Sequence, residues 1–150
     1  MNRVLASSEL KEIKNKQATV DELLIIDMSI ESYPDLVSQR YKKTLKIYFI
    51  DCYFNGVIQL SSILHKHSKI KILHILSDSS QSQLKLGNTV LDHVNLVDYA
   101  PKISSWSEFF HSHAEIKIYG DDIASTIKDQ SFLSMLSKVT SMTITTSNDL

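Results

Sequence analysis

The stretch Lys71-Ile72-Leu73-His74-Ile75-Leu76-Ser77-Asp78-Ser79 is an apolar run that ends in polar residues, and this pattern recurs along the chain. Comparable runs occur at residues 23–27, 45–51 and 115–119, and the β-branched segment 143–145 follows them. Short continuous apolar runs are typical of strands that are buried on both faces, as in parallel sheets. The sequence therefore predicts a mostly parallel sheet that carries polar side chains at the carboxyl ends of its strands.

The segments between these runs carry helix and turn signals. Pro34 opens a helical stretch over 34–41, because proline is favoured in the first turn of a helix. Gly87-Asn88 between alternating residues predicts a β-hairpin over 83–91. The other predicted helices cover 57–64, 92–99, 103–112 (separated from the preceding one by Pro101), 128–137 and about 8–16, the last capped by Ser8.

Strands that alternate with helices predict an α/β fold with right-handed crossovers and helices on both faces of the sheet. We expect a three-layer sandwich with a mostly parallel sheet of about five strands, flanking helices and a small β-hairpin. A chain of 150 residues is long enough for one such core. We assign residues 23–150 to this single domain and residues 1–22 to an N-terminal helical extension.

Composition narrows the class of protein. The hydrophobic fraction of 43% and charged fraction of 22% are those of a globular domain, and a net charge of −1 gives no footprint for nucleic acid. Residues 1–17 are charged and lack the apolar core of a signal peptide, and no run approaches the length of a transmembrane helix. With Cys52 as the only cysteine, no internal disulfide is possible. We expect a soluble, cytoplasmic protein that has protein partners, no cofactor and no transmembrane segment.

Three acidic residues follow two of the predicted strands. Asp78 ends the third strand, while Asp121 and Asp122 end the fourth. Open α/β sheets hold their sites at the carboxyl ends of the strands, so these carboxylates would converge if the two strands are neighbours. Converging carboxylates bind Mg²⁺ or Ca²⁺, share a proton or stay solvated. We favour solvated acids and keep the metal site as the alternative.

Other polar and aromatic residues have simpler interpretations. We expect Cys52 to be a partly buried structural thiol, and we expect His74 to be a core histidine with hydrogen-bond partners. The pairs His65/His67 and His111/His113 lie near predicted helix ends, where a protonated histidine complements the helix dipole. We favour this interpretation over a zinc site, because residues two apart on a helix do not face each other. Trp106, Phe109 and Phe110 are predicted to face the core, and exposure would instead make them an interface anchor. Tyr33, Tyr41, Tyr48 and Tyr53 flank the first two strands and could lie at an outer edge.

From Leu23 to Leu150 the chain resembles a domain of unknown function found near the start of large cyanobacterial and proteobacterial repeat proteins, itself similar to a shortened caspase–gingipain domain. The resemblance is carried by the segments 23–27, 49–51 with 55–56, 73–77, 84–89, 99–101, 105–106, 118–120 and 147–150. It implies a His and Cys dyad after Ser77 and Gly120. Asp78 and Asp121 stand there instead, and the dyad mechanism needs a thiolate and an imidazole.

These observations lead us to expect a non-catalytic protein-binding module, a degenerate caspase-like domain that serves as a structural or accessory subunit of a larger assembly. The first alternative is a hydrolase with a rebuilt, metal-assisted acidic site at Asp78, Asp121 and Asp122. The second is a targeting or adhesion domain, in the manner of the large repeat proteins that the resemblance implies.

Overall fold

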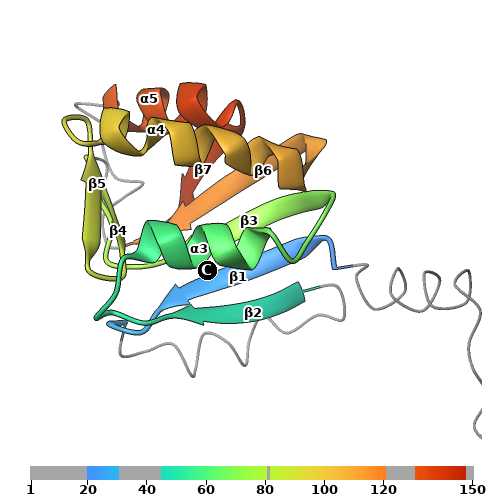
Figure 1. Ribbon diagram of the computed structural model, residues 1–150, viewed down its shortest axis with the longest axis horizontal. Coiled ribbons are helices and arrows are strands. Elements are labelled where there is room, and N and C mark those ends of the chain that lie inside the picture. The colour runs from blue at the N-terminus through green and yellow to red at the C-terminus, as the bar shows by residue number, and fades with distance from the viewer. Residues whose placement is uncertain (1–19, 31–44, 81, 121–130, 148–150) are drawn as a thin grey trace, which may run out of the picture.

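The computed structural model describes residues 20–30, 45–80, 82–120 and 131–147, and Figure 1 shows their arrangement. Five strands form one parallel sheet in the order β2-β1-β3-β6-β7. The strands are β1 (Glu22–Asp27), β2 (Leu45–Ile50), β3 (Ile70–Leu76), β6 (Phe110–Tyr119) and β7 (Thr143–Ser147). The predicted α/β class and mostly parallel sheet are confirmed.

The described helices all lie on one face of the sheet (Figure 1). They are α3 (Gly56–Leu64), α4 (Leu96–Ser104), the 3₁₀ helix η1 (Ser105–Phe109) and α5 (Ser131–Thr140). The helices predicted over 8–16 and 34–41, the second of which would supply the third layer, lie outside the described residues. Within the described part of the chain, no helix is long and apolar enough to cross a membrane.

The sheet separates two apolar clusters. The larger one lies beneath the helices and contains Leu60 of α3, Leu136 of α5 and alternate residues of the central strands. The smaller one occupies the opposite face around Ile26 and Tyr119. Trp106 is buried in the larger cluster, and its indole N–H donates to the Ser61 hydroxyl at 2.8 Å. The core position predicted for Trp106 is therefore confirmed, while Phe109 and Phe110 are only half-buried.

The region around Pro101 differs from the prediction. Instead of ending a helix, Pro101 lies inside α4, and the helix predicted over 103–112 is replaced by the end of α4, η1 and the start of β6. Proline leaves the carbonyl four residues earlier without an intrahelical donor. That carbonyl belongs to the exposed Val97, where water can replace the missing bond. β6 begins as early as Phe110, because this residue pairs with Ile70 of β3 across a register shift.

The predicted hairpin is present and sits at the carboxyl ends of the central strands (Figure 1). It consists of β4 (Gln83–Leu86) and β5 (Thr89–Asp92), joined by Gly87 and Asn88. Gly87 has φ +63°, and a Cβ built on it would lie 2.1 Å from the Phe54 carbonyl oxygen. Only glycine fits this turn without strain. The hairpin is thereby held close to the start of α3.

Candidate functional site

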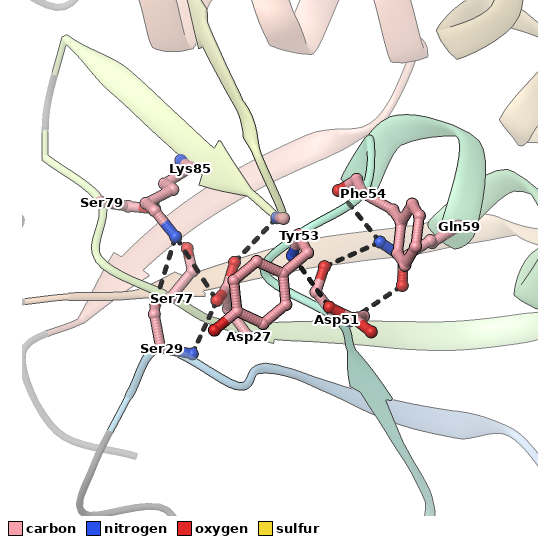
Figure 2. A network of polar contacts seen from close by, with 10 residues as sticks. Asp27, Ser29, Asp51, Tyr53, Phe54, Gln59, Ser77, Ser79 and Lys85 are labelled. Carbon is pink, nitrogen blue, oxygen red and sulfur yellow. Dashed lines mark hydrogen bonds and ion pairs between the residues drawn. The ribbon is translucent and has the colours of Figure 1, made fainter.

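The buried acidic group of the described region is the Asp27 carboxylate at the end of β1. Alternation along β1 puts Asp27 on the same face as Leu23 and Ile25, and this is the face that carries the hairpin. Its side chain has no exposed surface. Oδ2 accepts the Gly87 backbone N–H at 2.8 Å, and Oδ1 accepts the Ser29 backbone N–H at 2.9 Å. Figure 2 shows this carboxylate at the centre of a network of polar contacts.

Lys85 of β4 completes the environment of Asp27. Its ammonium group lies 3.5 Å from Asp27 Oδ1 and donates to the Ser29 hydroxyl at 3.1 Å. A buried charge is stable only where it is paired and hydrogen-bonded, and here two N–H groups and one ammonium group meet that need. We conclude that Asp27 anchors the hairpin to the sheet. The sequence signal for this role is a carboxylate that continues the buried face of an apolar strand.

A second closed set of contacts holds the loop after β2. The Gln59 side chain accepts the Asp51 backbone N–H at 2.9 Å and donates to the carbonyls of Asp51 and Phe54 at 2.9 and 3.1 Å. The Asp51 carboxylate accepts the Tyr53 backbone N–H at 2.8 Å. These bonds (Figure 2) fix the backbone of residues 51–54, while the side chains of Tyr53 and Phe54 are exposed.

The acidic site predicted from the sequence is only partly within the described region. Asp78 is exposed at the end of β3, and β3 and β6 are neighbours in the sheet, as convergence requires. Asp121 and Asp122 lie outside the described residues. Among the residues that are described, no group of three or more His, Cys, Asp or Glu side chains could hold a metal ion. The metal-binding alternative therefore remains a prediction.

Ser77 and Gly120, the residues that flank the implied dyad positions, have packing roles. Ser77 and Ser79 are buried, and their hydroxyl groups are hydrogen-bonded to each other. A Cβ on Gly120 would lie 2.5 Å from the Ser79 carbonyl oxygen. A side chain at position 120 would therefore push the loop after β3 away from the end of β6.

Cys52 and His74 occupy the surroundings expected for structural residues. Cys52 is half-buried beyond the end of β2, which lies at the edge of the sheet with β1 between it and β3. The His74 ring lies between two partners, with Nδ1 2.8 Å from the Tyr119 hydroxyl and Nε2 3.1 Å from Glu22 Oε1. The predicted hydrogen bonds of this histidine are confirmed, and its ring is partly buried.

The prediction that both His-x-His pairs end helices holds for only one of them. His65 is the C-cap of α3, where Nδ1 lies 2.7 Å from the Ser61 carbonyl oxygen. His111 and His113 instead belong to β6, where residues two apart share a face. Their ring centroids are 5.9 Å apart, and both side chains are exposed. The described residues supply no third His, Cys, Asp or Glu that would complete a group of three metal ligands with this pair.

Large apolar side chains are exposed at the carboxyl end of the sheet. They follow β1 or β2, lie in the hairpin or in the loop after it, or belong to the starts of α3 and α4, which all meet at this end (Figure 1). We call this set the carboxyl-end surface; its members are Met28, Tyr53, Phe54, Ile58, Val90, Val94 and Val97. Tyr53 is 80% exposed and Phe54 is 64% exposed. The most exposed aromatic side chains of the described region are thus Tyr53 and Phe54, and not those of residues 106–110.

Hydrogen bonds join the segments that carry this surface. The Phe54 carbonyl oxygen accepts the Asn88 backbone N–H at 2.9 Å, which links the loop after β2 to the hairpin. The Asn55 side chain caps α3 and donates to the Tyr99 hydroxyl of α4 at 3.2 Å. The Asn95 side chain donates to the Val90 carbonyl oxygen at 2.7 Å. The exposed apolar residues are therefore presented by a rigid set of neighbouring backbones.

Comparison with protein families matches residues 23–150 to the family described as a domain of unknown function, DUF4347. The match covers most of the sequence, and the chain belongs to this family. Comparison with curated proteins and with solved structures gives no significant match.

Proposed function

We propose, with membership of this family as the premise, that the chain is a non-catalytic protein-binding module that serves as a structural or accessory subunit. In this proposal it is a degenerate caspase-like domain, and it keeps the cytoplasmic location expected from the sequence. The observation that carries the proposal is the carboxyl-end surface. Exposed apolar patches of this kind, and exposed aromatic residues above all, mark sites of protein association.

The polar groups at the same end support a scaffold role. Asp27, Asp51 and Gln59 direct their oxygen and nitrogen atoms to the backbone of the chain itself, so that each stabilises a loop. Catalysis would need groups aimed at a substrate. The caspase–gingipain resemblance adds to this argument, because it implies that Asp78 stands in place of the imidazole base. A carboxylate there cannot complete a thiolate–imidazole pair.

The rigidity of the loop after β2 also favours binding. An interface residue that is already held in place loses little conformational entropy when a partner covers it. Residues 53 and 54 meet this condition, because their backbone is fixed by Gln59 on one side and by Asn88 on the other. Buried aromatic anchors typically contribute 2 kcal/mol or more, on the order of a thirtyfold change in affinity.

The decisive experiment is affinity purification of the full chain from its native cells, with quantitative mass spectrometry of the bound proteins. The comparison variant carries Phe54→Ser and Ile58→Ser. The matched control carries His111→Ser and His113→Ser, which remove two exposed rings from the opposite end of the sheet. We expect a stoichiometric partner to be retained by the wild type and the control and to be lost from the comparison variant.

Two results would count against the proposal. One is equal retention of every bound protein by the wild type and by the Phe54→Ser, Ile58→Ser variant. The other is metal-dependent hydrolysis of a peptide or phosphoester that disappears in Asp78→Asn, which would favour the rebuilt acidic site instead.

A further inference from the structure

Charge is distributed unevenly between the two ends of the sheet. At the carboxyl end, Asp51, Asp78, Asp92 and Asp98 make no ion pair with any described residue, and Lys85, the one lysine among the residues described there, is paired with buried Asp27. At the amino end the described residues include the acidic Asp21, 3.7 Å from Lys71, and Glu108, together with four exposed lysines. These lysines are Lys46 in β2, Lys66 and Lys69 after α3, and Lys71 in β3. The carboxyl-end surface therefore lies among acidic side chains.

The starts of α3 and α4 offset only part of this negative charge. Each helix start is equivalent to roughly half a positive charge, so the two together contribute about +1. The four aspartates contribute −4 in formal charge. Asp51 and Asp92 are engaged with backbone N–H groups, whereas Asp78 and Asp98 are exposed. A partner that approaches this end meets apolar side chains within a negative potential.

We propose that the partner of the carboxyl-end surface is a protein segment that carries apolar side chains among lysines or arginines. This inference rests on the proposed function and adds the chemistry of the partner to it. The apolar side chains of such a segment would cover Phe54 and Ile58, and its cations would lie beside Asp78 and Asp98. Complementary charge of this kind raises the association rate and selects among partners more than it raises affinity.

A second copy of the chain is a poor occupant of this surface. A two-fold symmetric contact would bring the acidic end of one copy against the acidic end of the other, and like charges repel. A head-to-tail contact would match charge, because it brings the acidic end against the lysines. It would, however, set the apolar side chains against an end where the described residues expose no large apolar side chain. The observations favour a different protein.

The test uses the full chain and three labelled synthetic peptides of about 18 residues in fluorescence anisotropy. The first peptide is an amphipathic helix of leucine and lysine, the second replaces each lysine by glutamate, and the third replaces each leucine by serine. We expect the leucine–lysine peptide to bind best. Its affinity should fall at least about tenfold between low and high salt, because exposed ion pairs are screened.

Two sets of variants separate the apolar and the acidic contributions. Phe54→Ser with Ile58→Ser should weaken the leucine–lysine peptide by about tenfold or more. Asp78→Asn with Asp98→Asn should weaken it about 2- to 10-fold, because each exposed charge contributes modestly. The matched control, Asp21→Asn with Glu108→Gln, removes two negative charges from the opposite end and should leave the affinity unchanged.

Equal binding of the lysine and glutamate peptides, both lost with Phe54→Ser and Ile58→Ser, would overturn the proposed partner chemistry while the protein-binding function stands. If the serine–lysine peptide binds as tightly as the leucine–lysine peptide, the binding comes from charge alone, and the proposed partner chemistry is overturned as well. Absence of binding by all three peptides has the same consequence. A dimer in sedimentation that dissociates in the Phe54→Ser, Ile58→Ser variant would identify a second copy as the occupant.

Discussion

At the scale of single residues, Asp27 is the position where we expect a substitution to destabilise the fold, because buried polar groups depend on its carboxylate. Its carboxylate has no exposed surface and accepts two backbone N–H groups beside one ammonium group. Removal of the carboxylate leaves the Gly87 N–H buried without its acceptor and leaves Lys85 without its counter-charge. The penalty for such a loss is larger than the net stability that the intact bonds provide.

We therefore predict that Asp27→Ala lowers the free energy of unfolding by about 2–4 kcal/mol. Asp27→Asn, which keeps one acceptor oxygen, should cost roughly half as much. Equilibrium unfolding in urea measures both values, and Asp78→Asn serves as the exposed control that should stay within about 0.5 kcal/mol of the wild type. An Asp27→Ala protein as stable as this control would show that the hairpin is held by other contacts.

Residues of this kind mark the limit of what could be predicted from the sequence. Asp27 was visible only as the last residue of a strand, because its partners come from Ser29 and from a hairpin some 60 positions later in the chain. The hydrogen bonds of His74 were predicted correctly, although its ring is only partly buried, since its place within an apolar strand already restricts it. Phe54 gave no signal, because an aromatic residue in a loop is buried or exposed according to tertiary packing alone.

At the scale of elements, a side-chain contact between Tyr48 and His67 joins β2 to the segment after α3. The Tyr48 hydroxyl lies 2.7 Å from His67 Nε2. Burial, helped by the neighbouring ammonium groups of Lys46 and Lys66, lowers the pKa of His67 below its usual value of about 6.5. Burial also raises the pKa of the Tyr48 phenol. Both shifts favour the uncharged forms of the pair.

This arrangement predicts a loss of stability on acidification. Because the pKa of His67 is lower in the folded chain than in the unfolded chain, the unfolded state binds the extra proton first as the pH falls through about 6.5. The melting temperature should therefore decrease from pH 7.5 to 5.5, and His67→Gln should reduce the slope. His111→Gln controls for the loss of one imidazole. An unchanged slope in His67→Gln would assign the acid sensitivity to other groups.

Helices and strands were predicted well where a single sequence pattern dominates, and less well where a local signal competes with tertiary contacts. The central strands could be predicted because continuous apolar runs have few alternatives in a chain of this size. Pro101 was predicted to end a helix, yet α4 continues through it, since only one hydrogen bond at an exposed turn is lost. His111 was assigned to a helix end because the pairing of Phe110 with Ile70, which extends β6, is a long-range contact.

At the scale of the whole molecule, the fold directs polar and apolar groups in opposite ways at the carboxyl end of the sheet. The polar atoms of Asp27 and Gln59 turn inward and tie loops to the chain, while the apolar side chains of Phe54 and Ile58 are exposed beside them. In a structural role the apolar side chains would be buried and the polar ones solvated. We therefore expect the exposed apolar side chains to add little to the stability of the isolated chain, which leaves them available for the association proposed above.

The final prediction compares the carboxyl-end surface with the core directly. Phe54→Ser with Ile58→Ser should change the free energy of unfolding by no more than about 1 kcal/mol, because both side chains are mostly exposed. Leu60→Ala, in the same helix as Ile58 but fully buried, should lower it by about 2–5 kcal/mol. The surface variant should also elute earlier than wild type from a hydrophobic interaction column, whereas Leu60→Ala should not. If the surface variant proves as unstable as Leu60→Ala, these side chains belong to the structure of the chain and cannot form a free binding surface.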